Sequence, residues 1–169
     1  RDLSNHVVVS PDLGNAKQAT LLARLLGLPV AAGNKQRLAD DKVVISSVVG
    51  DVAGKKAIVL DDEIATGGSI IEIVSRLADF GCAEASIACT HGLFAGSAVE
   101  RLTSATHISE VVSTNTVPAP ENFPGLKVLS VASLFAEAIA RIHSGNSVST
   151  LFNGVDPAYA QPQEPEGLF

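Results

Sequence analysis

The sequence predicts an α/β protein with one parallel sheet flanked by helices, and three observations carry that prediction. Short runs rich in Val, Ile and Ala alternate along the chain with stretches whose apolar residues recur at helical spacing. Hydrophobic residues make up 46% of the 169 residues and aromatic residues only 4%, with no Trp and no Met. Such an aliphatic composition is typical of parallel strands buried between helices. The strand–helix alternation also favours right-handed crossovers between neighbouring strands.

The amino-terminal part of the chain is predicted to form a strand, a helix and a second strand. The apolar run at 6–10 ends at Ser10-Pro11-Asp12, which is a strand-then-loop pattern. A second strand is predicted at 28–32, and the polar, weakly periodic residues from about 33 to 50 predict a mobile loop or a hairpin. The helix between the two strands has one apolar face and ends at Gly27; the residues of that face are Ala16, Ala19, Leu22, Ala23 and Leu26.

The rest of the chain continues the alternation and then changes composition. One domain is expected over 1–152, because a chain of this length can bury one core but not two. From residue 153 the chain is rich in Pro, Gln and Glu, so 153–169 is predicted to be a disordered tail. The predicted elements are strands at 56–62, 85–90, 107–113 and 127–131, and helices at 67–79, 97–102 and 131–143.

Charge, hydropathy and cysteine usage exclude several classes of function. The chain has 12 Lys and Arg against 18 Asp and Glu, a net charge of −6, which disfavours nonspecific binding to nucleic acid. No apolar run approaches the roughly 18 residues of a membrane span, so no membrane partner is expected. Cys82 and Cys89 are too few for a disulfide framework and suit a reducing compartment, so we expect a cytoplasmic protein.

Residues 58–69, Ile-Val-Leu-Asp-Asp-Glu-Ile-Ala-Thr-Gly-Gly-Ser, carry the strongest functional pattern. A buried-strand run ends in Asp61 and Asp62, whose carboxylates can accept hydrogen bonds from a diol or hold a divalent cation. The following turn, 66–69, opens an amphipathic helix and can wrap a phosphate with backbone N–H groups at the positive end of that helix. Carboxylates beside a phosphate cradle suit a sugar phosphate. The alternative is an ordinary acidic turn before a glycine-rich helix start.

This stretch resembles the phosphoribosyl-diphosphate loop of the phosphoribosyltransferase fold, and further segments narrow the resemblance. Together they resemble the ribose-phosphate diphosphokinases, also called phosphoribosyl-diphosphate synthetases, over about residues 6–152 and over the carboxyl-terminal half of that enzyme alone. The resemblance implies a phosphoribosyltransferase-type (type I) sheet. With the initial Arg1, it also suggests a fragment, a processed chain or an incomplete gene model. The matching segments, in the family's order, are 8–14, 35–37, 49–55, 89–92, 98–101, 114–116, 128–132 and 142–152.

The resemblance implies a reaction and a role for each matching residue. The family moves the β,γ-diphosphate of ATP to the 1-hydroxyl of ribose 5-phosphate, which gives 5-phosphoribosyl 1-diphosphate for nucleotide biosynthesis. Mg²⁺ is implied as cofactor, with Asp12 in its environment. Lys35 and Arg37 match the Lys-x-Arg pair of the family's catalytic loop. The implied ribose 5-phosphate site comprises Asp61, Asp62, Ala65, Thr66, Gly67, Gly68 and Ser69.

The sequence departs from the family's pattern at two positions near these residues. Asn15 stands where the family commonly has a second Gly, which bears on how closely the backbone can approach a ligand there. Ala65 stands where many members have Asp, which removes a carboxylate but leaves the phosphate cradle intact.

Several of these residues also have a purely structural interpretation. Asp12 could cap the helix that follows it. Lys35 and Arg37 could be solvated loop charges. His91 is expected to be a hydrogen-bonded structural histidine rather than a catalytic one. The segment with Ser147, Ser149 and Phe152 resembles a regulatory phosphate site of the family, or it is simply a helix-exit turn with a hydrophobic anchor.

The resemblance also bears on partners and on rival functions. It implies ATP and ribose 5-phosphate as ligands, and a homo-oligomer, dimeric or hexameric. Because the family's adenine-binding residues come largely from the other half and from a neighbouring subunit, we expect this chain alone to be inactive. One rival is a phosphoribosyltransferase that consumes the sugar diphosphate, and another is a non-catalytic regulatory homologue. The first should carry stacking aromatics for a base, and the second should lose the loop or the Lys-x-Arg pair.

Overall fold

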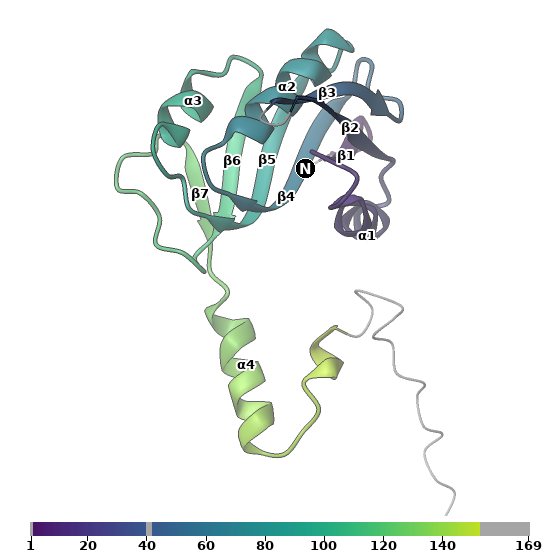
Figure 1. Ribbon diagram of the computed structural model, residues 1–169. Helices are drawn as coiled ribbons and strands as arrows, with labels where there is room; N and C mark the ends of the chain where they lie inside the picture. The colour runs from purple at the N-terminus through teal and green to yellow at the C-terminus, as the bar shows by residue number, and fades with distance from the viewer. Residues whose placement is uncertain (1, 40–41, 153–169) are drawn as a thin grey trace, which may run out of the picture. The chain divides into compact units, whose positions relative to one another are not determined.

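The structure, a computed structural model, describes residues 2–39 and 42–152 and has a seven-stranded sheet as its centre (Figure 1). The strand order is β3-β2-β1-β4-β5-β6-β7, and every neighbouring pair is parallel except β2 and β3. This confirms the predicted α/β fold with a mostly parallel sheet. The strands are β1 (His6–Ser10), β2 (Val30–Ala39), β3 (Lys42–Val49), β4 (Lys56–Ile64), β5 (Glu84–Gly92), β6 (Ile108–Thr114) and β7 (Leu126–Leu129).

The position of β1 in the sheet marks the point where the strand order reverses. From β1 the chain proceeds outward to β2 and β3, then returns to place β4 on the other side of β1, and continues outward to β7. The strand order therefore reverses between β1 and β4. In open α/β sheets, ligands bind outside the carboxyl ends of the strands at such a reversal. The turn after β1 and the carboxylates of β4 both lie there.

Helices cover the two faces of the sheet, and the alternation of side chains along β1 shows which helix covers which face. Val8 packs with α1 (Ala16–Leu26) through Ala19 and Ala23. Val7 and Val9 point to the opposite face and share the main core with α2 (Gly68–Asp79) and α3 (Ala98–Ser104). The first predicted helix is thus confirmed with its end: Gly27 has φ 66, and N–H groups after α1 bond back to Ala23 and Arg24 carbonyls.

The segment predicted as a mobile loop or a hairpin is an antiparallel hairpin. β2 begins at Val30 and extends to Ala39, well past the predicted strand end at residue 32, and pairs with β3. The pairing contains two register shifts, between Asn34 and Lys35 and between Arg37 and Ala39, which account for the weak periodicity of this part of the sequence. β4 likewise continues to Ile64, so Asp61 and Asp62 lie within the strand rather than at its predicted end, residue 62.

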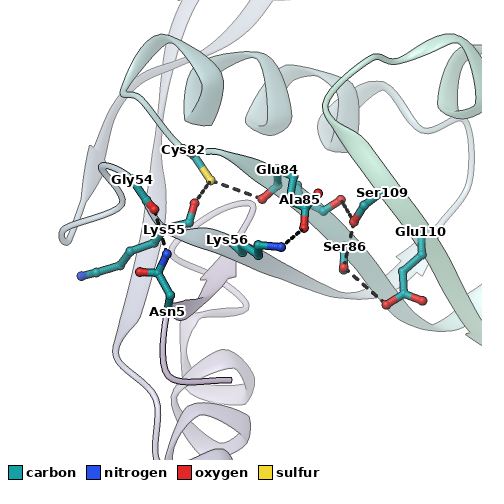
Figure 2. A network of polar contacts seen from close by, with 10 residues as sticks. All are labelled: Asn5, Gly54, Lys55, Lys56, Cys82, Glu84, Ala85, Ser86, Ser109 and Glu110. Carbon is teal, nitrogen blue, oxygen red and sulfur yellow. Dashed lines mark hydrogen bonds and ion pairs between the residues drawn. The ribbon is translucent and has the colours of Figure 1, made fainter. Parts of the chain in front are cut away.

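A network of polar contacts closes the amino ends of β4, β5 and β6, at the opposite edge of the sheet from the carboxylates (Figure 2). Asn5 donates its side-chain amide to the Gly54 carbonyl at 3.0 Å, and Lys56 pairs with Glu84 at 2.7 Å. The buried thiol of Cys82 lies 3.1 Å from the Lys55 carbonyl oxygen, and burial raises its pKa. Because these groups satisfy one another, we interpret this edge as structural.

Residues 131–152 belong to a second compact unit, which is described by itself. It contains α4 (Ala132–His143) and a 3₁₀ turn, η1 (Ser149–Phe152). α4 ends as predicted, with Ser144 as its cap and Gly145 at φ 72. The predicted disordered tail, 153–169, lies outside the described residues. Within the part of the chain that the structure describes, no helix is both long and apolar enough to cross a membrane.

Candidate functional site

The turn after β1 places Asp12 and Asn15 beside the end of β4. Asp12 accepts the Asn15 N–H on Oδ1 at 3.1 Å, so its carboxylate does cap the turn before α1. Gly14 leaves room for that carboxylate, because a Cβ at this position would lie 3.1 Å from Asp12 Oδ1. Asn15 in turn donates its side-chain amide to the Leu60 carbonyl at 3.1 Å. This hydrogen bond joins the turn to β4.

A cleft of about 580 Å³ lies between α1 and the carboxyl end of β4. Its apolar wall comes from α1 and Leu60, and its polar floor from the two aspartates of β4 and from Thr90 at the end of β5. The carboxyl ends of β4 and β5 thus border the same cleft. The lining residues are Gly14, Asn15, Gln18, Leu21, Leu22, Leu25, Leu60, Asp61, Asp62 and Thr90.

The carboxyl group of Asp61 has a raised pKa. Burial raises its pKa to about 6, and the negative charges of Asp62 and Asp12 act in the same direction. Its side chain accepts the Asp62 N–H at 3.0 Å, and Asp62 accepts the Glu63 N–H at 2.9 Å. On β5, burial and the charge of Asp61 raise the pKa of Cys89 to about 12, so this thiol stays protonated. A concentration of like charge of this kind favours a cation or a hydrogen-bond donor as ligand.

The donor set fits a magnesium ion that is bound partly by substrate. Among the described residues, no cluster of three or more His, Cys, Asp or Glu side chains could hold a metal by itself. Mg²⁺ does not need such a cluster, because it keeps several waters and binds through one or two carboxylates plus substrate phosphates. Asp12 and Asp61, whose charges interact, supply that number of carboxylates.

The Thr66–Ser69 turn forms a second, smaller hollow of about 150 Å³ next to Asp61. α2 begins at Gly68, and no acidic residue in its first turn offsets the positive end of the helix dipole. Gly67 has φ 73, a left-handed conformation that glycine adopts without strain. A Cβ at Gly67 would face Leu102 at 3.5 Å, so this glycine shapes the turn rather than leaving space in the hollow. Gly68 is different, since its Cβ would lie 3.8 Å from the Thr66 hydroxyl.

Residues 93–95, which no motif in the sequence marks, support this turn through backbone hydrogen bonds. Leu93 and Phe94 donate their N–H groups to the Ile64 carbonyl, at 3.0 and 3.1 Å, and Ala95 donates to the Ala65 carbonyl at 2.8 Å. The matching segment 89–92 stops just before these residues, and backbone contacts between residues some thirty apart leave no local pattern.

His91 has the hydrogen-bonded partner expected of a structural histidine. Its Nδ1 lies 2.9 Å from the Thr116 hydroxyl, and Thr116 and Thr114 both donate to the Thr90 carbonyl, at 2.9 and 2.7 Å. The ends of β5 and β6 are thus joined on the same rim as the carboxylates.

The remaining predicted site residues belong to other elements of the chain. Lys35 and Arg37 are in β2, where their backbones pair with Ile45 and Val43 of β3. Their side chains are outside the described part of the structure. Ser147, Ser149 and Phe152 belong to the second unit, where the hydroxyls of Ser147 and Ser149 are 2.6 Å apart. Arg141 of α4 bonds to the Thr150 hydroxyl and, at 3.3 Å, to the Ser147 carbonyl, which makes a helix-exit turn held by local contacts.

Curated proteins that are similar to this chain over most of its length are named ribose-phosphate pyrophosphokinases. A curated protein of Streptomyces coelicolor named putative ribose-phosphate pyrophosphokinase is 56% identical over 154 residues, which cover 90% of this chain and 49% of the relative. The ribose-phosphate pyrophosphokinase of Deinococcus radiodurans is 44% identical over 156 residues, covering 89% of this chain and 48% of the relative. The chain thus spans about half the length of the curated relatives it matches.

A solved structure and a family model agree with these relatives. The crystal structure of phosphoribosylpyrophosphate synthetase from Mycobacterium smegmatis matches with a TM-score of 0.76 and 40% identity, over 84% of this chain and 46% of that one. The resemblance drawn from the sequence is therefore confirmed. The family model described as the phosphoribosyl synthetase-associated domain matches residues 36–153, and the chain belongs to that family.

Proposed function

We propose that this chain is the sugar-phosphate-binding part of a ribose-phosphate diphosphokinase. The reaction would transfer the diphosphate of ATP to the 1-hydroxyl of ribose 5-phosphate and give 5-phosphoribosyl 1-diphosphate. One observation carries the proposal: a single strand–turn–helix unit presents Asp61 and the Thr66–Ser69 hollow side by side, at the point where the strand order reverses. The names of the relatives support the same reaction.

The 5-phosphate would sit in the Thr66–Ser69 hollow. Backbone N–H groups at the start of α2, together with the hydroxyls of Thr66 and Ser69, would supply donors at the positive end of the helix dipole. Ala65, where many family members have Asp, lines the hollow without adding a charge that would repel the phosphate.

The ribose hydroxyls would lie on Asp61, which borders both that hollow and the cleft, and on Asp62, which borders the cleft. Asp12 would join Asp61 in holding Mg²⁺, which, when bound, neutralises negative charge on the diphosphate oxygens. Binding a cation or hydroxyl donors would favour the ionised form of Asp61, whose pKa of about 6 lies close to neutral pH. The site is thus arranged so that ligand and metal relieve a repulsion among its own carboxylates.

Lys35 and Arg37 would provide the cations that stabilise the transferring diphosphate. Phosphoryl-type transfer depends on positioning and on charge neutralisation rather than on covalent chemistry by the protein. A two-stranded hairpin can carry a pair of cations toward a bound polyphosphate, and lie away from it otherwise.

The same proposal covers the second substrate, the oligomeric state, the location in the cell and a regulatory site. ATP would be the second substrate, the protein would act as a homo-oligomer in the cytoplasm, and Ser147, Ser149 and Phe152 would contribute to a regulatory phosphate site. Since the chain spans half of its relatives, we propose that it binds ribose 5-phosphate but does not complete the reaction without the other half.

Titration calorimetry tests this proposal directly. Ribose 5-phosphate should bind the chain, and its affinity should rise when Mg²⁺ is added. Ribose without the phosphate should neither bind nor compete. In nuclear magnetic resonance, the amide signals of Thr66, Gly67 and Ser69 should shift on binding. Binding of ribose and ribose 5-phosphate with equal affinity would show that the Thr66–Ser69 turn is not a phosphate site.

A further inference from the structure

Residues 93–95, between β5 and α3, form backbone hydrogen bonds with the residues that lead into the Thr66–Ser69 turn. The N–H groups of Leu93 and Phe94 both bond to the Ile64 carbonyl, and the N–H of Ala95 bonds to the Ala65 carbonyl. From α3, Arg101 Nη1 lies 3.4 Å from the Thr66 carbonyl oxygen. The carbonyl groups of three consecutive residues, Ile64, Ala65 and Thr66, are therefore held by hydrogen bonds from residues 93–95 and from Arg101.

These carbonyls determine where the N–H groups of the turn point. A trans peptide unit is planar, with its C=O and its N–H directed to opposite sides. The Ala65 carbonyl and the Thr66 N–H belong to one such unit, and the Thr66 carbonyl and the Gly67 N–H belong to the next. Fixing the two carbonyls against Ala95 and Arg101 therefore directs the two N–H groups away from that segment.

Phe94 is the structural anchor of this segment. Within the described residues it is the one non-glycine residue with a positive φ, 46°, a conformation that is strained for a bulky side chain. Its ring is 5% exposed and meets the Phe123 ring edge-to-face, with centroids 5.0 Å apart and planes at 90°. Strain of this kind persists where the surrounding packing enforces it, here through the aromatic pair.

Gly92 provides the space that the Phe94 ring occupies. A Cβ at position 92 would lie 2.3 and 2.6 Å from two ring atoms of Phe94, and 3.1 Å from the Cβ of Ser113. A real Cβ cannot approach that closely, so any side chain at 92 would displace the ring. Gly92, Phe94 and Phe123 thus form one packing unit, which we call the aromatic anchor.

We propose that Phe94 is a positioning residue for phosphate binding: the aromatic anchor fixes residues 93–95, whose N–H groups hold the Ile64 and Ala65 carbonyls and thereby aim the donors of the Thr66–Ser69 turn. The inference rests on the proposed function, since it assumes that this turn binds the phosphate of ribose 5-phosphate. Phe94 itself would not touch the ligand.

The test compares Phe94→Gly with a core variant remote from the turn. Glycine accepts the left-handed conformation at 94 without strain, so this variant removes the ring and leaves the backbone free. Its dissociation constant for ribose 5-phosphate should rise about ten- to a hundredfold, the effect of one or two badly aimed charge-assisted hydrogen bonds. Leu77→Ala, at a buried position near the carboxyl end of α2, should lower the unfolding temperature but leave the dissociation constant unchanged.

A double-mutant cycle supplies a readout that a loss of stability would not produce. Gly92→Ala alone should weaken ribose 5-phosphate binding, because it displaces the Phe94 ring. In the Phe94→Gly background it should have little further effect, because the ring is already gone. Should Phe94→Gly not fold, Phe94→Leu, which keeps an apolar side chain without the edge-to-face contact, carries the same comparison.

The outcomes separate this inference from the function on which it rests. If the parent chain does not bind ribose 5-phosphate, both are wrong. If the parent binds and a folded Phe94→Gly variant binds equally well, the function stands and the positioning role is overturned. Additive effects of Gly92→Ala and Phe94→Gly on affinity would likewise overturn it, since the two residues would then not act through one ring.

Discussion

The side-chain amide of Asn15 donates a 3.1 Å hydrogen bond to the Leu60 carbonyl, and so joins the turn before α1 to the strand that carries the aspartates. The two residues both line the cleft between α1 and the carboxyl end of β4, and they are forty-five positions apart in the sequence. At a position where the family commonly has Gly, this chain therefore has a side chain that joins the two elements by a hydrogen bond. It fixes the separation between Asp12, which accepts the Asn15 N–H, and Asp61, which follows Leu60.

Asn15→Ala should lower the free energy of unfolding by about 1 kcal/mol, the usual value of such a hydrogen bond. It should also weaken Mg²⁺-dependent binding of ribose 5-phosphate, because Asp12 and Asp61 would no longer be held at a fixed separation. Asn5→Ala is the matched control, since Asn5 makes the same kind of bond, 3.0 Å to the Gly54 carbonyl, at the opposite edge of the sheet (Figure 2). Chemical denaturation and calorimetry measure both variants. An Asn15→Ala variant with the affinity of the parent chain would show that the Asn15–Leu60 hydrogen bond has a structural role only.

Asp61→Asn and Asp62→Asn should each reduce the affinity for ribose 5-phosphate by about 1–3 kcal/mol, the range for a charge-assisted hydrogen bond that is poorly made. Both side chains border the cleft, and Asp61 also borders the phosphate hollow. Glu121→Gln is a suitable control, because Glu121 is exposed and lines neither the cleft nor the phosphate hollow. Parental affinity in both Asn variants would mean that the carboxylates are structural.

The raised pKa of Asp61 predicts how stability depends on pH. Its pKa is about 6 in the folded protein against 3.8 ordinarily, because burial and neighbouring carboxylates oppose ionisation. The unfolded chain therefore gives up this proton at lower pH than the folded chain. The contribution of Asp61 to stability should be complete below about pH 4, should decline as the pH rises to 6, and should stay constant above that.

Urea denaturation of the parent and of Asp61→Asn across this pH range measures that contribution. The difference in unfolding free energy between the two should change in favour of the Asn variant between about pH 4 and pH 6. Added Mg²⁺ should reduce the change, because a bound cation favours the ionised carboxylate. A difference that does not vary with pH would contradict the shift.

Gly68→Val should abolish ribose 5-phosphate binding while the protein stays folded. Gly68 has no positive φ, so its backbone accepts a side chain, and that side chain would begin 3.8 Å from the Thr66 hydroxyl, at the phosphate hollow. Ser75→Val, a β-branched substitution at an exposed position of the same helix, controls for the effect on helix stability. Calorimetry that finds the parental affinity in Gly68→Val would remove the hollow from consideration as a ligand site.

The regular elements of this fold could be predicted from local patterns. α1 has one apolar face and ends at Gly27, and both features are visible in the sequence. The run before Asp61 is long and aliphatic, which identified β4 and, through it, the site. The hairpin of β2 and β3 could not be distinguished from a loop, because its strands pair with register shifts and charged residues interrupt the alternation.

Features that depend on contacts between distant segments were not visible in the sequence. The extension of β4 to Ile64 follows from its pairing with β5, which continues through Gly92. The support of Ala65 by Ala95 involves only backbone atoms, so no residue type marks it. Asn15 attracted notice only as a departure from the family, and its bond to Leu60 required the two elements to be placed in space.

The last prediction separates catalysis from binding at Lys35. An interaction made chiefly in the transition state changes kcat far more than substrate affinity. In an enzyme completed with the half that the relatives carry, Lys35→Ala should reduce kcat by about a hundred- to a thousandfold, or about 3–4 kcal/mol, with little change in the KM for ribose 5-phosphate. Arg37→Ala should lose kcat similarly and should also weaken ATP binding, since a guanidinium can bind a phosphate bidentately.

Lys42→Ala provides the matched control for Lys35, because Lys42 carries the same charge in the partner strand of the same hairpin. If the loss of kcat came from a disturbed hairpin or from a general loss of positive charge, the two lysine variants would behave alike. A loss confined to Lys35→Ala would assign the effect to that side chain. Steady-state kinetics at saturating ATP and Mg²⁺ decide between these outcomes, and a near-parental kcat in Lys35→Ala would favour the interpretation of the chain as a regulatory homologue.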